Sequence, residues 1–361
     1  MGIKKVTNKS FEFLNIANPS ESVLKELKEK YEFNPLDLED YINKTQIAKV
    51  EAYDNYHLLV LDFPVLTTER GYLDKHRKPS EPPRPLPIKF VRSTISNLLT
   101  LPATTLSYTL SPLAYPKMKK IFYSQVYFFI GKDYLVLLHD NELPIINEIF
   151  KLCQENSSDR EDLMGKGPIF LAYRIIDALV DTCFPIVNEL SATIEKIDRQ
   201  LEGKKSQDAL EDISVTRRNL VFFQTMVKPI LPIFRQLEDG KYEALDGKMK
   251  RYWSNVLDHI QNLSDRLEDN RELIEGISES NESLINSKNN EIIAFLTIIF
   301  TLSLPATVFG TFFGMNILLP GGIETGPWTF WGPYTTFILI IIASIIPLLI
   351  MLVYFRFKRW I

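Results

Sequence analysis

Apolar positions change their spacing along this chain, and each change predicts a different kind of structure. Up to about residue 160, short apolar runs alternate with helical patterns. Strands are expected over 11–16, 56–66, 126–130 and 134–139, and helices over 20–31, 35–42 and 142–155. Such alternation predicts an α/β domain. From residue 168 the pattern is helical, with one long helix expected over 169–203 and a second over 207–239.

A third long helix is expected from residue 248, because no helix stop occurs before Pro305. Its apolar residues recur in alternating steps of four and three, which is coiled-coil spacing. This seam consists of Met249, Trp253, Val256, Ile260, Leu263, Leu267, Ile274, Ile277 and Leu284, with Asn270 and Asn281 as polar members. A helix of about 65 residues would be roughly 100 Å long. The pattern predicts a stalk that continues into a membrane span and assembles with other stalks along its seam.

Two uncharged runs, 292–313 and 333–355, lie near the C-terminus. Each is long enough to cross the ~30 Å hydrocarbon core of a membrane as a helix. The loop between them carries one charge, Glu324, whereas the tail carries Arg356, Lys358 and Arg359. The positive-inside rule therefore predicts a cytoplasmic tail and, after two crossings, a cytoplasmic N-terminal body. No signal-peptide pattern is evident at the N-terminus, which agrees with this topology.

These patterns predict seven consecutive parts. They are a cytoplasmic α/β domain (1–165), long antiparallel helices (166–246), a stalk helix (247–291), the first membrane helix (292–313), an outer loop (314–332), the second membrane helix (333–355) and a basic cytoplasmic tail (356–361).

Composition narrows the function. The formal net charge is −4 and no basic stripe is present, so nucleic-acid binding is not expected. Cys153 and Cys183 have no metal-ligand spacing, and the four histidines are scattered and receive no metal role. No nucleophile–base constellation or Gly-rich phosphate loop is present, so an enzyme is not expected.

The first membrane run has one face richer in hydroxyl groups. At 100° per residue, a face centred on Thr297 includes Asn290, Ile293, Thr301, Leu304, Val308 and Thr311, with Thr307 at its edge. A polar stripe with apolar constrictions is typical of a gated ion path. Ser and Thr also occur at ordinary membrane-helix contacts, so helix packing remains an alternative interpretation.

The end of this run carries a recognisable motif. Gly314-Met315-Asn316 directly after a membrane span, a second span soon after, and a basic tail together resemble the CorA family of magnesium channels. Further segments resemble the family in the same order: 34–40 (NPLDLED), 49–53 (KVEAY), 176–181 (IDALVD), 218–220 (RNL), 289–291 (NNE), 296–299 (LTII) and 354–355 (YF). The segment 67–120 fits the family poorly, and no function is assigned to it.

The resemblance implies a funnel-shaped homopentamer in the plasma (inner) membrane, with the first span lining one central pore. It implies passive uptake of Mg2+, with Co2+ or Ni2+ as further ions and no organic cofactor. By position, Gly314, Met315 and Asn316 form the selectivity filter, and Asn290 lines the cytoplasmic mouth. Thr307 becomes an internal polar ring and Leu296 and Leu304 belong to the gate, although Leu296 lies about 100° from the face centre.

In the family, cytoplasmic Mg2+ bound between subunits closes the pore. Glu39, Asp40 and Asp177 match acidic residues of those sites by motif position. The stalk residue that should meet Asp40 across the subunit contact aligns with Asn255, where the family often has an acid. Asp258 lies one turn further along as an additional candidate. For Glu39 and Asp40 the alternative is a solvated helix face; for Glu324, cation collection at the outer mouth and a simple exposed loop charge remain open.

Three hypotheses follow. The first is the magnesium channel, with membrane lipid, divalent cations and copies of the same chain as partners. The second is a Zn2+ or other transition-metal transporter of the same superfamily. The third is a two-span sensor or scaffold that transports nothing; it predicts an output domain, for which the α/β part shows no catalytic motif.

Overall fold

The computed structural model describes residues 3–8, 11–43, 47–68, 119–202, 206–242, 249–315 and 326–358, without the side chains of 202 and 206–209. Most of the segment 67–120, to which no function was assigned, therefore lies outside the described residues, as do Asn316 and Glu324. The chain divides into two compact units, Met1–Ile277 and Ser278–Ile361. Each unit is described by itself below.

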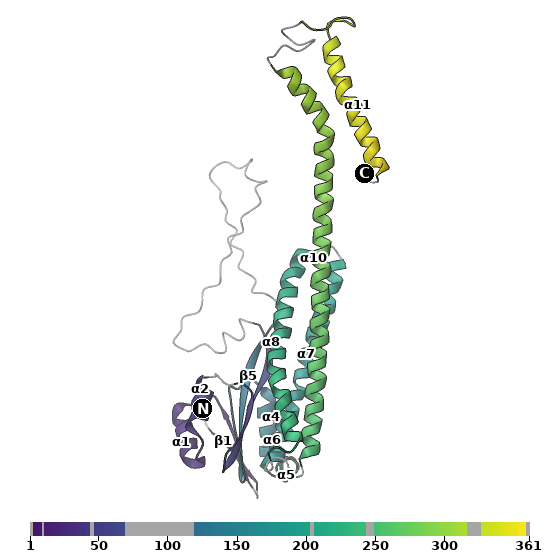
Figure 1. The fold of residues 1–361 in the computed structure, drawn as a ribbon. Helices are drawn as coiled ribbons and strands as arrows, with labels where there is room; N and C mark the ends of the chain where they lie inside the picture. The colour runs from purple at the N-terminus through teal and green to yellow at the C-terminus, as the bar shows by residue number, and fades with distance from the viewer. Residues whose placement is uncertain are drawn as a thin grey trace. The chain divides into compact units, whose positions relative to one another are not determined.

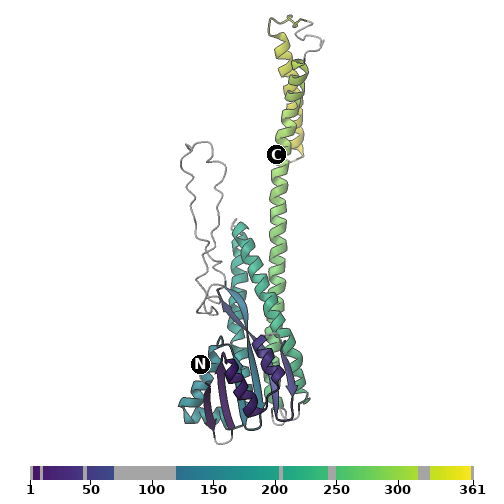
Figure 2. The same ribbon diagram turned by 90° about the vertical axis from the view of Figure 1, so that its left-hand side faces the viewer.

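A six-stranded sheet organises the first unit (Figures 1 and 2). Its strands lie in the order β1-β2-β6-β5-β4-β3. Only the β2–β6 pair, among the described strands, is parallel. The strands are β1 (Lys4–Asn8), β2 (Phe11–Ala17), β3 (Lys49–Ala52), β4 (Tyr56–Thr67), β5 (Lys120–Gly131) and β6 (Tyr134–His139).

Helices cover both faces of this sheet because its central strands are apolar on both sides. Figure 1 shows α1 (Glu21–Tyr31) and α2 (Pro35–Asn43) on one face. They enclose a core that includes Leu27, Val60 and Phe129. The other face packs against α4 (Pro144–Glu155) and the long helices, around a core that includes Leu61 and Phe128. A short helix, α5 (Ser157–Met164), follows α4.

The single helix expected over 169–203 is wrong, because the structure has two. Helix α6 (Pro168–Asp181) ends one residue before Thr182, and α7 (Cys183–Glu202) follows at once. Pro185 supplies the reason: it has no N–H to donate to the carbonyl of Asp181, four residues earlier, and its ring crowds that carbonyl. The Thr182 hydroxyl donates instead to the Leu179 carbonyl at 2.6 Å, which stabilises the end of α6. Helix α8 (Ser206–Glu238) then completes this part of the unit.

Helix α10 (Lys250–Gly314) confirms the expected uninterrupted helix and is 65 residues long. Its seam, however, is buried by the same chain. Trp253, Val256, Ile260, Leu263, Leu267 and Ile274 are each at most 2 % exposed and belong to the core shared with α6, α7 and α8. The polar seam member Asn270 donates to Ser191 Oγ of α7 at 2.9 Å. The expectation that these positions assemble with other stalks is therefore wrong, because a bundle within one chain produces the same heptad spacing.

Three described elements were not expected from the sequence: β1, β3 and α5. Both strands lie at the edges of the sheet, where few side chains are buried and apolar alternation is weak. Strand β5 also begins six residues before the expected start, at Lys120, and pairs with β4 through Thr67↔Lys120.

The second unit contains the rest of α10 and helix α11 (Thr335–Phe357). Both are long and apolar enough to cross a membrane, with mean hydropathies of 2.3 and 3.0 over their most apolar windows. Figures 1 and 2 both show α11 alongside the last part of α10.

Candidate ion pathway and cation-binding residues

The last part of α10 separates into a covered side and an uncovered side. Ile298 and Pro305 are buried, and Leu302 and Phe309 are half-buried. At 100° per residue these four lie roughly 80–140° around the helix from Thr297. The face predicted from the sequence is mostly exposed in this chain: Asn290, Ile293, Thr297, Leu304, Val308 and Thr311 are exposed, and Thr301 is half-buried. That face is therefore not the one covered within the chain.

The threonine hydroxyls of α10 are bound to the helix itself. Thr297 Oγ1 donates to the Ile293 carbonyl at 2.7 Å, and Thr301 Oγ1 donates to the Thr297 carbonyl at 2.7 Å. Thr307 and Thr311 repeat this bond to the residue four earlier, at 3.0 and 2.6 Å. Each hydroxyl proton is used inside the helix, so the oxygen presents acceptor lone pairs outward. Such oxygens can accept hydrogen bonds from the waters around a hydrated cation.

The two leucines expected at the gate differ in position. Leu304 lies on the face and Leu296 lies about 100° from its centre, and their side chains are 45 % and 58 % exposed in this chain. The side opposite the face carries Ile292, Phe295 and Ile299, which are also exposed and suit contact with lipid.

The Gly-Met-Asn motif begins where α10 ends. Gly314 is the last helical residue, and the Met315 N–H donates to the Phe312 carbonyl at 3.3 Å. The Met315 side chain is exposed. Asn316 and Glu324 lie outside the described residues, so their roles remain predictions.

Four aromatic residues before and at the start of α11 form a feature that the sequence analysis missed. Trp328, Phe330, Trp331 and Tyr334 are all exposed. The backbone N–H groups of Trp328 and Trp331 donate to the hydroxyls of Thr336 and Thr335, respectively, each at 3.0 Å. These bonds hold the segment against the start of α11. Aromatic rings in this position are typical of the membrane–water interface. The sequence could have shown this feature, because four aromatic residues occur within the seven residues 328–334.

Helix α2 places its acidic residues in three different environments. Asp37 is buried and accepts from Lys49 Nζ and the Tyr56 hydroxyl, each at 3.3 Å. Glu39 is exposed and Asp40 is half-buried. The hydrogen bonds of Asp37 thus join α2 to the sheet, whereas the Glu39 side chain is exposed to solvent.

A further carboxyl group near this helix was missed. Asp62 of β4 accepts from Gln125 Nε2 at 2.8 Å, and the Tyr127 hydroxyl donates to Gln125 Oε1 at 3.1 Å. Burial raises the pKa of Asp62 to about 6. Burial, followed by the charges of Asp40 and Asp62, also raises the pKa of Tyr127, so these acids share one electrostatic environment. An acid within an apolar strand was the sequence signal.

The structure brings Asp177 and Asn255 together within one chain. Asn255 Nδ2 donates to Asp177 Oδ1 at 3.3 Å, across the contact of α6 with α10. Asp258 is exposed on α10. Contact of Asn255 with Asp40 of another copy stays a prediction. Among the described residues, no three His, Cys, Asp or Glu side chains are already placed to hold a metal ion.

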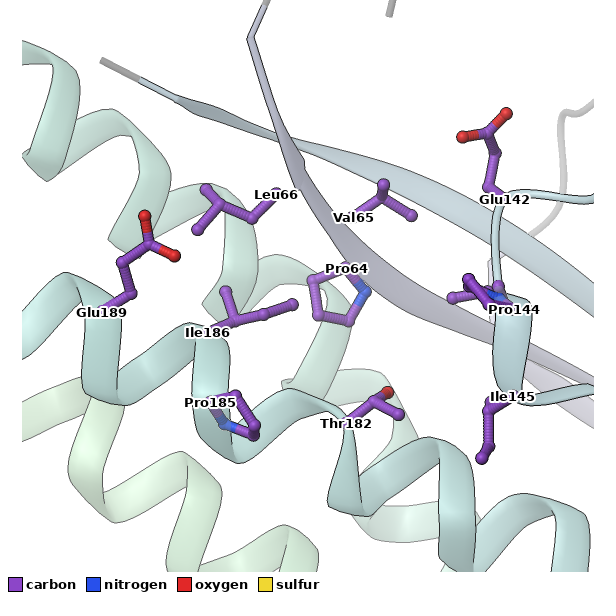
Figure 3. A pocket seen from close by; sticks show the side chains of 11 residues that line it. Pro64, Val65, Leu66, Glu142, Pro144, Ile145, Thr182, Pro185, Ile186 and Glu189 are labelled. Atoms are coloured by element: carbon purple, nitrogen blue, oxygen red, sulfur yellow. The ribbon is translucent and has the colours of Figure 1, made fainter. Parts of the chain in front are cut away.

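One hollow in the first unit lies apart from these residues. It has a volume of about 280 Å³ and is lined by the end of β4, the start of α4 and the α6–α7 junction. Figure 3 shows Glu142 and Glu189 on opposite sides, with Pro64, Val65 and Ile186 between them. Glu189 already pairs with Lys119 at 2.8 Å. Separated acids across an apolar floor do not form a cation site.

Comparisons with known proteins agree with the motif. A family model described as "CorA-like Mg2+ transporter protein" matches residues 101–359, well over half of the chain. The cobalt/magnesium transport protein CorA of Thermotoga maritima is 23 % identical over 94 % of this chain and 80 % of that protein. The Bacillus subtilis protein YfjQ is 26 % identical over 53 % of this chain and 59 % of its own length, which is less than two thirds.

Solved structures give the same fold. The complete structure of the CorA magnesium transporter from Methanocaldococcus jannaschii matches with a TM-score of 0.68 at 18 % identity, covering 99 % of this chain and 94 % of that one. The full-length CmaX protein matches with a TM-score of 0.62 at 14 % identity, over 98 % of this chain and 90 % of that chain. At these identities the likeness concerns the fold alone. The family is shown by the family model that matches residues 101–359. The chain belongs to the CorA family of Mg2+ transporter-like proteins.

Proposed function

We propose that this chain is one subunit of a homopentameric channel that lets Mg2+, and Co2+ as a second ion, enter the cytoplasm passively. The observation that carries the proposal is the uncovered threonine face of α10, which lies away from the side covered within the chain. The relatives named cobalt/magnesium transport proteins supply the ion class. Copies of α10 arranged around an axis would place this face along a central path.

The chemistry of the face suits a hydrated cation. Mg2+ is small and gives up water reluctantly, so it tends to keep its hydration shell. Threonine oxygens whose protons are bound to the helix can accept from those waters. Asn290 would line the cytoplasmic mouth and Thr307 an internal polar ring. Leu304 would form the apolar gate, with Leu296 nearby but at the edge of the path.

The filter would be the ring of Asn316 side chains held by Gly314 and Met315. A neutral amide carbonyl accepts hydrogen bonds from a hydrated ion without binding it too tightly to leave. Glu324 would collect cations at the outer mouth.

The membrane potential would supply the driving force. The basic end of α11, with Arg356 and Lys358, favours a cytoplasmic C-terminus and a plasma-membrane location with both termini inside. An inside-negative potential then stabilises entry of cations by about 2.3 kcal/mol per charge per 100 mV.

Closure would follow from cytoplasmic Mg2+ bound between subunits. Glu39 and Asp40 of α2 would face Asp177, Asn255 and Asp258 of a neighbouring copy. Asn255 ligates through its carbonyl but adds no charge, so the site has one charge less than a site with an acid at that position. Weaker inhibition by Mg2+ is the expected consequence.

Purified protein in liposomes with an entrapped Mg2+-sensitive dye tests the pathway. Asn316→Ala should change the influx rate or the Mg2+/Co2+ selectivity, whereas Asn55→Ala, an exposed turn residue, should not. An unchanged rate and selectivity in Asn316→Ala would remove the filter assignment. Absence of any divalent flux in the wild type would favour the scaffold, and flux of Zn2+ without Mg2+ would favour the transition-metal transporter.

The α10 face has its own matched control. Thr297→Val and Ser303→Ala each remove one hydroxyl that donates within the helix, from Thr297 to Ile293 and from Ser303 to Phe300. Ser303 lies about 120° from the face centre. We expect slower Mg2+ influx in Thr297→Val only. Equal effects of the two substitutions would mean that this face does not line the path.

The sensor is tested by Asp40→Ala combined with Asp177→Ala. This variant should stay open at millimolar Mg2+ in the same liposomes, because the proposed ligands from both sides of the contact are removed. Inhibition at the wild-type Mg2+ concentration would place the sensor elsewhere.

A further inference from the structure

The C-terminal end of α11 carries two exposed cations. Arg356 lies in the last turn of the helix, and Lys358 is its C-cap residue. Both side chains are exposed, and neither forms an ion pair with another described residue. Residues 326–358 contain no Asp or Glu, so this part of the chain offers them no carboxylate. Both cations are therefore available to an anion from outside the chain.

An apolar stripe runs along α11 from Arg356. At 100° per residue, five apolar residues lie within about 40° of Arg356 around the helix. They are Ile338, Ile342, Ile345, Leu349 and Leu352, each between 38 % and 54 % exposed. The helix thus presents an uncovered apolar surface with a positive charge at one end. A phospholipid has the matching shape, with apolar chains below an anionic phosphate.

The stripe is not the side of α11 that the chain covers. Ser344, Leu348 and Met351 are half-buried, and Phe355 is buried. These four residues lie roughly 80–140° around the helix from Arg356. Figures 1 and 2 show the last part of α10 alongside α11, where it can cover that side. The stripe is therefore free within this chain to contact a ligand from the membrane.

The length of the stripe matches one leaflet of a membrane. The step from Ile345 to Arg356 is about 16 Å along a helix at 1.5 Å per residue. Half of the ~30 Å hydrocarbon core is about 15 Å. An acyl chain whose headgroup contacts Arg356 would therefore lie along Leu352, Leu349 and Ile345.

The two cations favour an anionic headgroup over a zwitterionic one. A guanidinium group can bind two phosphate oxygens at once, and hydrogen bonds between charged groups are about twice as strong as neutral ones. A zwitterionic headgroup brings its own ammonium group, which competes for the phosphate and is repelled by Lys358. An anionic headgroup brings no cation, so its charge can be shared by Arg356 and Lys358.

We propose that Arg356 and Lys358 bind the headgroup of one anionic phospholipid of the cytoplasmic leaflet, with one acyl chain along the stripe from Leu352 to Ile345. Arg356 would hold the phosphate, and Lys358 would add positive charge at the membrane surface. The choice of leaflet rests on the topology given in the proposed function. The site does not depend on ion conduction.

The test counts lipids bound to the full-length protein in detergent by native mass spectrometry, with phosphatidylglycerol and phosphatidylcholine as probes. We expect the wild type to bind phosphatidylglycerol more tightly. Arg356→Gln combined with Lys358→Gln should weaken that binding by about fivefold for each cation removed, which is the effect of one Lys or Arg near an anionic surface. Binding of phosphatidylcholine should stay the same. Millimolar inorganic phosphate should not displace the lipid, because phosphate alone cannot use the apolar stripe.

Lys250→Gln combined with Arg251→Gln is the matched control, because it also removes two exposed cations, at the start of α10. A thermal melt shows that both variants are folded. Equal binding of the two lipids by the wild type would overturn the site, as would a phosphatidylglycerol preference that survives without Arg356 and Lys358. An equal loss in the control would reduce the effect to net charge and overturn it too. Displacement by inorganic phosphate would leave a site for free anions only.

The outcomes separate this site from the channel. A phosphatidylglycerol preference that depends on Arg356 and Lys358 establishes the site, even if the wild type carries no Mg2+ into liposomes. Mg2+ influx together with equal binding of both lipids would retain the channel and remove the lipid site. In that case a carboxylate of another copy, such as Glu291, becomes the candidate partner of the two cations.

Discussion

Asp62 offers a quantitative test of the structure, because the fold holds a carboxyl group where its charge is costly. It lies on β4 opposite Gln125 of β5, and the Gln125 amide donates to it at 2.8 Å. Burial nevertheless raises its pKa from 3.8 to about 6. The folded state therefore binds a proton more tightly than the unfolded state does.

The sign of the effect follows from linkage. Well below pH 3.8 both states are protonated, and the Asp62 carboxyl does not change the free energy of unfolding. As the pH rises through 4 to 6, the unfolded chain ionises first and is stabilised relative to the fold. Above pH 6 the cost is complete at about 3 kcal/mol, from a shift of about two units at 1.36 kcal/mol each. At pH 5 roughly half of that cost is present.

Asp62→Asn removes the charge and keeps an oxygen that accepts from Gln125. We expect the free energy of unfolding to rise by about 3 kcal/mol at pH 8 and by about half as much at pH 5. For a unit of this size the pH 8 gain corresponds to roughly 5–10 °C in Tm. Intrinsic-fluorescence melts of the detergent-purified protein at one scan rate measure this. Glu155→Gln, an exposed carboxyl at the end of α4, is the control.

A Tm gain that is the same at both pH values would contradict the reasoning, because a contact effect does not depend on ionisation. A loss of Tm at pH 8 would show that a cation or a donor outside the described residues compensates Asp62.

Two further predictions use the same melts. Burial lowers the pKa of His139 to about 4, while its Nε2 bonds with Asn15 Oδ1 at 2.7 Å. Neutral His139 should therefore contribute stability above pH 6.5 that is lost as the pH falls toward 4, by up to about 3 kcal/mol. The melt is followed in Asp62→Asn, which removes the opposing effect of Asp62, and a Tm of this variant unchanged between pH 7.5 and pH 5 would contradict the prediction. Leu267→Ala should lower the free energy of unfolding by about 2–5 kcal/mol at every protein concentration, because Leu267 packs within one chain. Leu284→Ala, at a half-exposed seam position, should lower it little. A Leu267→Ala effect that grows on dilution would mean that the seam packs between chains.

The long α10 helix and the central strands could be predicted because their signals are local. Strand β4 is a mostly apolar run, and no proline precedes Pro305 in α10, where the isolated Gly276 does not end the helix. The break at Thr182 was also local, since Pro185 shows it, but continuous apolar spacing on both sides concealed it. Edge strands β1 and β3 were missed because they bury too few side chains to leave a period.

Partners of side chains could not be predicted in the same way. Heptad spacing shows that one side of α10 is covered, but not whether the covering helices belong to the same chain. His259 lies beside Asp181 because of how α6 packs on α10, and no local sequence pattern encodes that packing. The end of α10 at Gly314 could be predicted from the sequence alone, because the uncharged apolar run ends at Phe313.

The burial of the seam changes where assembly has to be sought. With Trp253 to Ile274 covered by the chain's own helices, those positions have no surface left for another copy. Among the described residues, two uncovered surfaces are candidates: the threonine face of α10, and α2 with its surroundings, where Leu36, Ile42 and Ile47 are each more than half exposed. Exposed apolar groups of this kind mark interaction sites.

Glu39 and Asp40 lie between Leu36 and Ile42 on the same helix. A contact that covers these apolar residues would also desolvate the two acids, and a divalent cation bound there would offset that cost. Assembly through α2 and cation sensing by its acids are therefore one hypothesis. The variant Asp40→Ala with Asp177→Ala tests it, because it removes one proposed ligand from each side of the contact.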